Sequence, residues 1–396
     1  MNPGTWNLEP LGLYLHVPFC SAICNYCNFN RGLFDAGQKT RYVEALAAEI
    51  REAGLKACTT TAAATDVVQT FRSADTIYFG GGTPSLLEPA EVERIIGACR
   101  RAFDVTPDAE ITLEANPETV DERKLTAFRE AGVTRLSYGV QSFREPELRR
   151  LSRLHSVGRA RQALAEARAA GFDNVSLDLM MWLPGQSVSH WLESVDAAIM
   201  LSPDHISLYL LEVYPNAPLK DEMARAQWSQ APDDDAAAMY VTAMERLEAA
   251  GYEQYEISNV ARPGRRCRHN LKYWRDGEWM GFGCGAHGTV GGVRTKNVAG
   301  IEDYIQCIGR GELVAAEVRR LSPSERLGDA LFMGLRLTDG IDLEAISQRY
   351  GVDVWQKHGA ELEPFLAAGL LTRQGAKLAL TRQGMLLANE VMTVFV

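Results

Sequence analysis

The sequence predicts an α/β fold in which a parallel sheet is followed by a small, mainly helical domain. Three observations lead to this prediction. Six short apolar or β-branched runs are bounded by turn residues, segments with helical periodicity separate them, and the pattern changes after about residue 300. Alternating strands and helices give right-handed crossovers, so the first part forms either an incomplete parallel (β/α)6 barrel or an open doubly wound sheet.

The expected strands and helices follow from these patterns. The apolar runs that read as buried strands cover residues 11–17, 76–81, 111–116, 135–141, 174–183 and 205–213. The clearest helices have apolar residues at helical spacing and cover residues 87–103, 120–132, 156–171 and 187–201. Residues 54–73 are rich in small side chains, and we expect them to form a loop insertion after the first helix.

A weak internal repeat supports the strand and helix order. The segments EAGVTRLSYGV, AAGFDNVSLDL and AAGYEQYEIS each end a helix in Ala-Gly, directly before an expected strand. Gly132, Gly171 and Gly251 are therefore expected at the left-handed position that follows a helix.

The composition is that of an ordinary globular protein. Of the 396 residues, 46% are hydrophobic and 23% are charged, and the formal net charge is −10. This acidic balance argues against a protein that mainly neutralises nucleic-acid phosphates. The sequence shows no apolar run long enough to span a bilayer and no secretory signal, so we expect a cytoplasmic protein with reduced thiols.

The C-terminal part has a different pattern from the rest. Helical segments at 321–336, 341–351 and 361–371 precede a short β-ribbon and a last helix within 377–392, which is the order of a winged-helix-like module. We therefore expect two domains, 1–300 and 301–396. From Leu321 onward there are 7 Lys and Arg against 9 Asp and Glu, so this module lacks the basic face of a DNA reader, and a packing or lid role is favoured.

Three of the eight cysteines lie close together near the N-terminus. Cys20, Cys24 and Cys27 have the spacing C-x3-C-x2-C and directly follow the first expected strand. Thiolates on one tight loop can bind three corners of a 4Fe–4S cubane, and one iron keeps an open position because no fourth thiol is nearby. A zinc site and an electron-transfer cluster with a remote fourth ligand are the alternatives.

With these three cysteines, the sequence resembles the radical S-adenosylmethionine (SAM) superfamily. The flanking segment YLHVPFC resembles the branch that contains the oxygen-independent coproporphyrinogen dehydrogenases and the HemW heme chaperones. The resemblance implies an incomplete parallel barrel whose open iron is chelated by the amino and carboxylate groups of SAM. One electron from the cluster then releases a 5′-deoxyadenosyl radical. The resemblance covers nearly the whole chain, from Leu11 to the C-terminal module.

The resemblance also implies a set of SAM contacts at the ends of the expected strands. Gly81, Gly82 and Thr83 of the GGGTP turn would meet the methionine group, since residues without a Cβ let the backbone approach a ligand closely. The other implied contacts are Tyr14, Tyr26, Glu114, Gln141, Arg153 and Asp178. In α/β barrels the active site lies at the carboxyl ends of the strands, near which these residues fall. A structural role is the alternative, because buried polar groups need partners.

A second motif, RCRHNLKYW, resembles the HNxxYW motif of the HemW family, and the following GFGCGAHG resembles that family's glycine-rich loop. Imidazole is a natural axial ligand of heme iron, so His269 is expected to bind heme. Tyr273 and Trp274 would pack against the macrocycle if the segment is helical. The alternative is a hydrogen-bonded histidine that positions neighbouring elements. His287 in the glycine-rich loop is either a competing ligand or a residue that supports another ligand.

The resemblance implies a heme chaperone that binds a 4Fe–4S cluster and SAM and hands heme, its cargo, to an acceptor protein. An electron donor is a further expected partner and nucleic acid is not, while a homodimer and a peripheral membrane contact are left open. The alternatives are a radical SAM enzyme, such as coproporphyrinogen III dehydrogenase or a related methyltransferase, and a nucleic-acid-binding regulator that uses the winged module.

Three residues depart from the usual pattern of the family. Asn28 stands where Asp commonly follows the third cysteine, and Cys284 stands where alanine is usual. Trp182 replaces a small residue at the mouth of the fifth strand. Because a tryptophan there would narrow the substrate side of the cavity, Trp182 bears most directly on the identity of the substrate.

Overall fold

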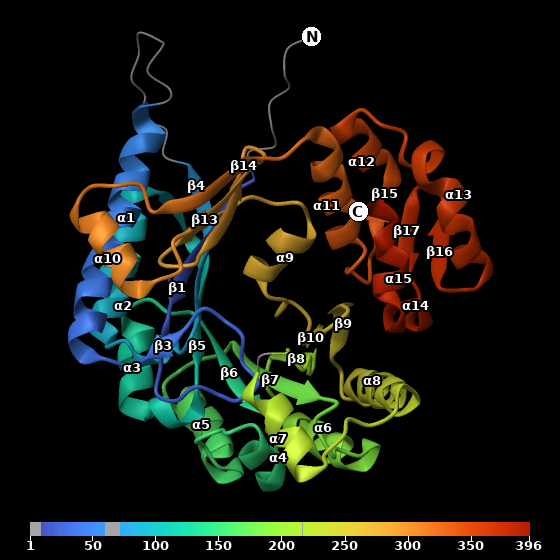
Figure 1. The fold of residues 1–396 in the computed structure, drawn as a ribbon, viewed down its shortest axis with the longest axis horizontal. Coiled ribbons are helices and arrows are strands. Elements are labelled where there is room, and N and C mark those ends of the chain that lie inside the picture. The colour runs from blue at the N-terminus through green and yellow to red at the C-terminus, as the bar shows by residue number, and fades with distance from the viewer. Residues whose placement is uncertain (1–8, 60–71, 216) are drawn as a thin grey trace. The chain divides into compact units, whose positions relative to one another are not determined.

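A computed structural model describes residues 9–59, 72–215 and 217–396, which form two compact units (Figure 1). The first unit combines described residues of Met1–Gly139, Leu151–Val175 and Gly277–Arg319. The second combines Val140–Arg150, Ser176–Asp276 and Arg320–Val396. Each unit is thus assembled from segments far apart in the sequence. The expected domains 1–300 and 301–396 stay a prediction.

The first unit is built on a mixed sheet whose strand order is β14-β13-β12-β11-β1-β4-β5-β6. Its strands are β1 (Leu11–Val17), β4 (Ser73–Gly81), β5 (Asp104–Ala115), β6 (Arg135–Gln141), β11 (Trp279–Phe282), β12 (His287–Val290), β13 (Val293–Asn297) and β14 (Ala315–Arg320). Strands β1, β4, β5 and β6 are parallel, as expected, and β11 is parallel to β1. The β11–β12 and β12–β13 pairs are antiparallel. The sequence patterns missed this extension because its strands are short and partly exposed.

The helices of the first unit are α1 (Ala36–Thr59), α2 (Pro89–Ala102), α3 (Glu122–Glu130), α5 (Val157–Ala169) and α10 (Ile301–Gly309). Helix α1 lies beside both α2 and α10 (Figure 1). The loop expected at residues 54–73 needs correction, because α1 continues to Thr59. Helix α1 therefore includes the first residues of the small-residue segment. Residues 60–71 of the segment lie outside the described residues.

The three Ala-Gly repeats end their helices as predicted. Gly132, Gly171 and Gly251 have φ values of 107°, 85° and 84°, in the left-handed region where glycine carries no Cβ penalty. Each glycine thus stops a helix and lets the chain turn into the next strand.

The central strands of the first unit have two different faces. The side chains of Leu13, Leu15, Ile77, Phe79, Ile111 and Leu113 are at most 1% exposed and form the core. The alternate residues carry polar side chains, among them Tyr14, His16, Tyr78, Thr112 and Glu114. We call this second surface the polar face. Because successive side chains of a strand point to opposite sides, the apolar core fixes which residues reach the polar face.

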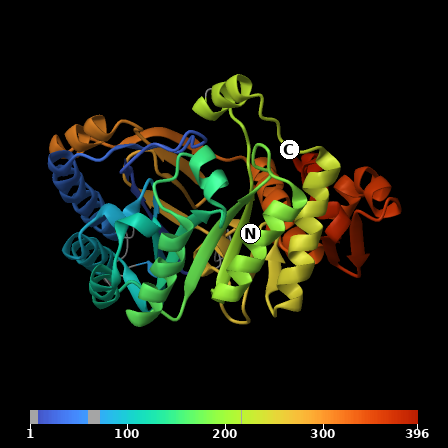
Figure 2. The same cartoon turned by 90° about the horizontal axis from the view of Figure 1, so that it is seen from below.

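The second unit contains two parallel strands, β7 (Val175–Met181) and β8 (His205–Leu210), followed in the sheet by the antiparallel β10 (Asn259–Ala261) and β9 (Glu253–Glu256). Its helices before the C-terminal module are α4 (Glu145–Arg150), α6 (Val188–Leu201), α7 (Pro218–Ala226), α8 (Asp233–Ala249) and α9 (Arg268–Trp274). Helices α6 and α8, yellow-green and yellow, lie side by side (Figure 2). The buried Trp191 of α6 fixes this contact, since its indole donates to the Met239 carbonyl of α8 at 3.0 Å.

The C-terminal module keeps the predicted order of three helices, a β-ribbon and a helical end, but it adds a short strand before the second helix and divides the last helix in two. Its elements are α11 (Pro323–Gly334), β15 (Ile341–Asp342), α12 (Leu343–Tyr350), α13 (Val354–Ala367), β16 (Leu371–Gln374), β17 (Lys377–Leu380), α14 (Arg382–Leu386) and α15 (Ala388–Met392). Helix α11 begins with a capping box, in which Ser322 and Glu325 bind each other's backbone amides. The strands form a small sheet of order β15-β17-β16.

Candidate functional site

The three clustered cysteines lie on one closed loop of the first unit, between β1 and α1. A short parallel ribbon of β2 (Phe19–Cys20) and β3 (Gly32–Leu33) ties the two ends of the loop together. Within the loop, the amide of Cys27 donates to the carbonyl of Cys24 at 3.2 Å. All three thiols are free; Cys20 is buried, and Cys24 and Cys27 are half-buried. We call residues 20–34 the cluster loop.

The surroundings of these thiols fit an iron–sulfur cluster. Burial raises the pKa of Cys20 and of Cys27, while two cations favour thiolates: Arg153 Nη1 lies 3.5 Å from Cys24 Sγ, and Arg31 donates to the Cys27 carbonyl. Among the described residues, no three His, Cys, Asp or Glu side chains are arranged to hold one metal ion. A cubane binds each thiolate at a different iron, so three thiolates on one loop are a donor set of the kind that holds an iron–sulfur cluster.

The glycine-rich turn after β4 packs against the cluster loop. The amides of Gly82 and Thr83 donate to the carbonyls of Val17 and Phe19, at 2.8 and 2.7 Å. A Cβ on Gly82 would lie 2.7 Å from the Phe19 carbonyl oxygen, which excludes larger residues. The buried Thr83 hydroxyl lies 3.7 Å from Cys20 Sγ. The turn and the loop are therefore one packed unit.

Glu114 lies beside this turn, on the polar face. Its Oε1 accepts a hydrogen bond from the Tyr78 hydroxyl at 2.8 Å, and its Oε2 accepts one from the Gly81 amide at 3.2 Å. Gly81 has a φ of +112°, which favours glycine. The ring of Tyr14 stacks on Tyr78 with centroids 6.3 Å apart. The structure thus brings Tyr14, Gly81 and Glu114, three predicted SAM contacts, together.

Arg153 joins the cluster loop to the ends of β5 and β6. Its guanidinium donates to Asn116 Oδ1 and to the Gly139 carbonyl, both at 2.6 Å, in addition to its contact with Cys24. Asn116 in turn donates to the Thr83 hydroxyl at 3.2 Å. Sequence reasoning missed Asn116, although it ends the expected strand ITLEAN. Burial raises the pKa of the neighbouring Tyr26, so its phenol stays neutral beside Arg153.

His16 is a second residue that the sequence analysis missed. Its Nε2 donates to the Asn30 carbonyl at 2.7 Å, so Nδ1, 3.1 Å from the Tyr14 hydroxyl, is the acceptor. Asn30 Nδ2 donates to the carbonyls of Cys284 and Ala299, both at 3.1 Å. This chain of contacts ties the cluster loop to the glycine-rich segment before β12. The signal was the histidine of YLHVPFC, a segment that the sequence analysis used only for its resemblance to a branch of the family.

Two further predicted SAM contacts, Gln141 and Asp178, fall in the second unit. The unit boundary lies inside β6, after Gly139, so Gln141 at the end of that strand is counted with the second unit. Gln141 has a φ of 71°, and its buried Oε1 has no hydrogen-bond partner among the described residues. An unsatisfied buried acceptor is costly, which fits a side chain that meets a ligand. Asp178 is half-buried on β7, in register with Ser207 of β8. Both residues stay predicted contacts.

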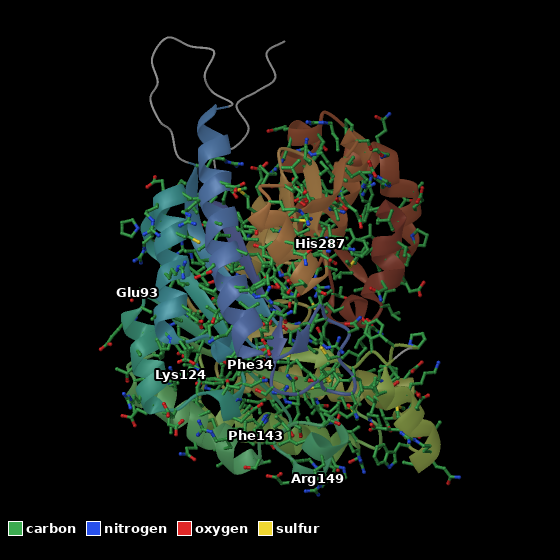
Figure 3. All side chains as sticks on the ribbon, turned by 60° about the vertical axis from the view of Figure 1, so that its left-hand side comes forward. Phe34, Glu93, Lys124, Phe143, Arg149 and His287 are labelled. Carbon is green, nitrogen blue, oxygen red and sulfur yellow. The ribbon has the colours of Figure 1, made fainter. Side chains whose placement is uncertain are left out.

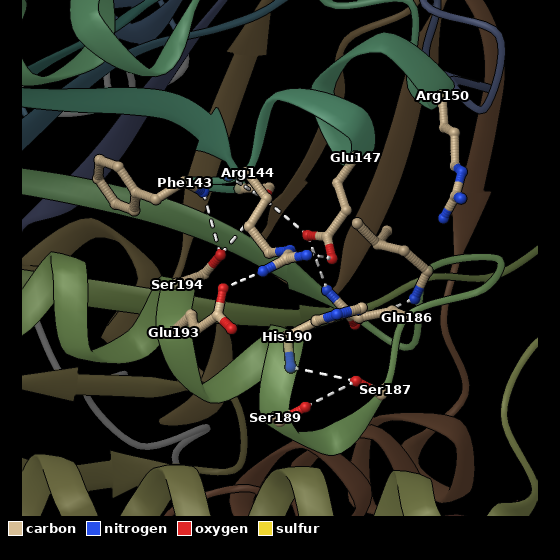
Figure 4. A network of polar contacts seen from close by, with 12 residues as sticks. Phe143, Arg144, Glu147, Arg150, Gln186, Ser187, Ser189, His190, Glu193 and Ser194 are labelled. Carbon is tan, nitrogen blue, oxygen red and sulfur yellow. Dashed lines mark hydrogen bonds and ion pairs between the residues drawn. The ribbon is translucent and has the colours of Figure 1, made fainter.

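A buried polar network fixes the segment after Gln141 (Figure 4). Glu147 Oε2 accepts hydrogen bonds from the Ser142 hydroxyl at 2.6 Å and from Gln186 Nε2 at 3.1 Å. The Ser194 hydroxyl of α6 accepts a hydrogen bond from the Phe143 amide at 3.1 Å. Burial raises the pKa of Glu147. These contacts tie residues 142–147 to Gln186 and to Ser194 of α6, and they thereby fix the backbone that follows Gln141.

His269 lies on α9, so the segment is helical, which is the condition under which Tyr273 and Trp274 were expected to pack against the macrocycle. The side chain is 1% exposed, and its Nε2 lies 2.8 Å from the Tyr273 hydroxyl. Trp274 is stacked by Arg336, whose guanidinium carbon lies 4.4 Å from the ring centroid. The imidazole Nε2 thus has a partner inside the protein, so heme ligation through this nitrogen requires that it leaves Tyr273.

Trp182 takes up an unusual backbone conformation. Its φ is 63°, a left-handed value that a bulky residue rarely adopts. The indole donates to the Ala231 carbonyl at 2.8 Å, and the Trp182 carbonyl accepts a hydrogen bond from Gln230 at 3.0 Å. These two contacts fix the ring at the end of β7.

Comparisons with known proteins agree with this geometry. Residues 14–198 match the radical SAM superfamily, and residues 321–387 match the HemN C-terminal domain. The chain is 35% identical to the heme chaperone HemW of Bacillus subtilis, over 96% of this chain and 98% of that one. It is 38% identical to HemW of Mycobacterium tuberculosis, over 97% and 94% of the two chains.

A solved structure has the same fold. The coproporphyrinogen III oxidase HemN of Escherichia coli, a radical SAM enzyme, matches with a TM-score of 0.83 and 23% identity, over 98% of this chain and 90% of that one. This likeness confirms the α/β fold with a mainly helical C-terminal module. No helix among residues 9–59, 72–215 and 217–396 is long and apolar enough to cross a membrane.

Proposed function

The chain belongs to the HemW family of radical SAM proteins, and we propose that it is a heme chaperone that carries heme to an acceptor protein. The observation that carries this proposal is the 35–38% identity to HemW chaperones over nearly the whole length of both chains. A match of this extent includes the cysteine loop, the HNLKYW segment and the C-terminal module in a single protein.

Cys20, Cys24 and Cys27 would hold a 4Fe–4S cluster, and the bound cluster supplies single electrons to SAM. The residues around the cluster fix the cluster loop and the adjoining ends of the strands, where SAM would bind. Arg153 bridges the cluster loop and the end of β5, and Glu114 presents a carboxylate that already accepts two hydrogen bonds. A carboxylate at this edge suits the cationic groups of SAM. The remaining predicted SAM contacts are Tyr14, Tyr26, Gly81, Gly82, Thr83, Gln141 and Asp178.

The cluster loop also has the character of a surface for a protein electron donor. Its side chains Ile23, Phe29, Leu33 and Phe34 are 42–65% exposed, and two of its thiols are half-exposed. Phe34 is labelled in Figure 3. Apolar groups gathered at an exposed loop favour contact with a partner. A cytoplasmic location, a homodimer and a peripheral membrane contact stay predictions.

The test is an anaerobic titration with hemin after cluster reconstitution. We expect stoichiometric binding, seen as a Soret band, and transfer of the heme to an apo-acceptor protein. Ser in place of each of Cys20, Cys24 and Cys27 should remove the visible absorbance and the iron of the cluster. Cys307→Ser, a half-buried cysteine of α10, is the matched control and should keep both. Absence of stoichiometric hemin binding would reject the chaperone function.

The same preparation separates the alternative enzyme from the chaperone. Conversion of coproporphyrinogen III to protoporphyrinogen IX by the reconstituted protein would replace the proposal with an oxidoreductase function. If the protein binds hemin, seen as a Soret band, but does not convert coproporphyrinogen III, the result supports the chaperone function.

A further inference from the structure

His287 lies where a cargo molecule can reach it, unlike His269. It begins β12, where Figure 3 labels it, and its side chain is exposed. His269, by contrast, is 1% exposed and engaged by Tyr273. Among the residues that the structure describes, the His287 ring makes no hydrogen bond or ion pair. Partial burial and the nearby Lys296 cation hold the pKa of His287 below its usual range. The ring is therefore neutral near neutral pH, which is the form that ligates a metal.

The strand register places His287 on the polar face. Trp279 of β11 pairs with Gly12 of β1 on one side and with Thr289 of β12 on the other. Paired residues share a face, and so do residues two apart along a strand. His287 therefore lies on the same face as Tyr14, two strands away, a separation of about 10 Å. The electrostatic influence of His287 on His16 agrees with this placement.

Two cations share this face with His287. Lys296 of β13 is directly opposite His287, and Arg294 is opposite Thr289, the next residue on the same side. Lys296 has an ion pair with Glu317 at 3.5 Å, and both side chains are exposed, at 39% and 70%. Such an exposed pair is weak and is readily replaced by another carboxylate. The face therefore offers positive charge to an anionic ligand.

An aromatic ring lies against the backbone of His287. The indole of Trp279 donates to the carbonyl of His287 at 3.1 Å, which fixes the ring against the start of β12. The surface thus combines a nitrogen ligand, a flat apolar ring and two cations on three neighbouring strands. A metalloporphyrin with two carboxylate side chains needs these three kinds of contact.

We propose, on the basis of the chaperone function above, that the heme cargo binds on the polar face at β11–β13 with His287 as its axial iron ligand. Lys296 and Arg294 contact the propionate carboxylates, and Trp279 packs against the porphyrin. Heme would then lie on the same face as Tyr14 and Glu114, the predicted SAM contacts. His269 would act as a structural residue that fixes α9 through Tyr273.

The test is a hemin titration of reconstituted full-length protein, with the Soret band and the iron coordination read by visible and electron paramagnetic resonance spectroscopy. His287→Ala should weaken hemin binding by about tenfold or more and lose the histidine-ligated spectrum. Added imidazole should restore that spectrum. A double variant, Arg294→Gln with Lys296→Gln, should weaken binding several-fold without moving the Soret band, because the iron ligand is kept.

Two controls keep the test specific. His190→Ala removes a half-buried histidine of the second unit and should bind hemin as the unmodified chain does. Cluster absorbance should be unchanged in His287→Ala, and His287→Gln serves if the alanine variant does not fold. Unchanged affinity and Soret band in His287→Ala, or their loss in His269→Ala alone, would overturn the proposal. If the unmodified chain binds no hemin, the proposed function itself fails.

Discussion

Gly82→Ala tests whether the glycine-rich turn supports the cluster loop directly. The added Cβ would lie 2.7 Å from the Phe19 carbonyl oxygen and 2.9 Å from both the Pro18 carbonyl carbon and the Val17 carbonyl oxygen. All three are backbone atoms, so no flexible side chain can move away. To reach the 3.4 Å of ordinary contact, the backbone of residues 17–19, which leads into the cluster loop, must recede by about 0.7 Å.

The cost follows from the contacts that this movement breaks. Overpacking of a tight interior costs about 1–3 kcal/mol. The hydrogen bond from the Gly82 amide to the Val17 carbonyl, now 2.8 Å, adds about 1 kcal/mol when it is lost. The free energy of unfolding should therefore fall by about 2–4 kcal/mol. Because Cys20 follows Phe19 directly, the iron content after reconstitution should fall as well.

Denaturant unfolding of the cluster-free protein and the iron content after anaerobic reconstitution measure the two effects. Gly309→Ala is the matched control: it ends α10, no atom lies within 4 Å of the added Cβ, and stability should change by no more than about 1 kcal/mol. A Gly82→Ala protein that is as stable as the unmodified chain and holds full iron would refute the reasoning. Loss of SAM binding alone, with iron retained, would show that this glycine serves the ligand instead.

Four further predictions concern single residues. Burial raises the pKa of Cys20, so protons compete with iron: loading of the cluster should rise between about pH 7 and about pH 9, and a flat iron titration would contradict this. For the same reason the apo-protein should lose stability as the pH rises above the unfolded thiol value of 9.0. Arg336→Met removes the cation that now lies 2.9 Å from the fully buried carboxylate of Glu256. The free energy of unfolding, measured with denaturant, should fall by about 3–5 kcal/mol. Adding Glu256→Gln to the Arg336→Met chain should recover part of this loss. Tyr273→Phe leaves the buried Nε2 of His269 without this partner and should cost about 1–3 kcal/mol, and an unchanged unfolding curve would show that the contact is dispensable.

Local patterns were enough to predict much of the fold. The apolar runs marked β1, β4, β5, β6, β7 and β8, because a strand buried beneath helices needs apolar side chains over its own length. Gly132, Gly171 and Gly251 marked helix ends, because only glycine adopts a left-handed φ without cost. The cysteine spacing of the cluster loop is likewise a local property, and it was readable without any tertiary contact.

The sequence could not indicate how distant segments meet at the site. Asn30 contacts Cys284, which is 254 residues away, and β1 pairs with β11, and neither contact leaves a periodic pattern in the sequence. Strand β12 is short and partly exposed, so its sequence contains no apolar run that would predict a strand.

The sequence by itself determined which chemical groups the protein carries. These are three thiols on a tight loop, a glycine-rich turn and an HNLKYW segment within an α/β chain. Only the tertiary structure decided which groups are available. In the folded chain His269 is buried and contacts Tyr273, His287 is exposed on the polar face, and the glycine-rich turn packs against the cluster loop. The physical reason is that burial and register depend on packing between segments far apart in the chain, whereas spacing and propensity depend on neighbours alone.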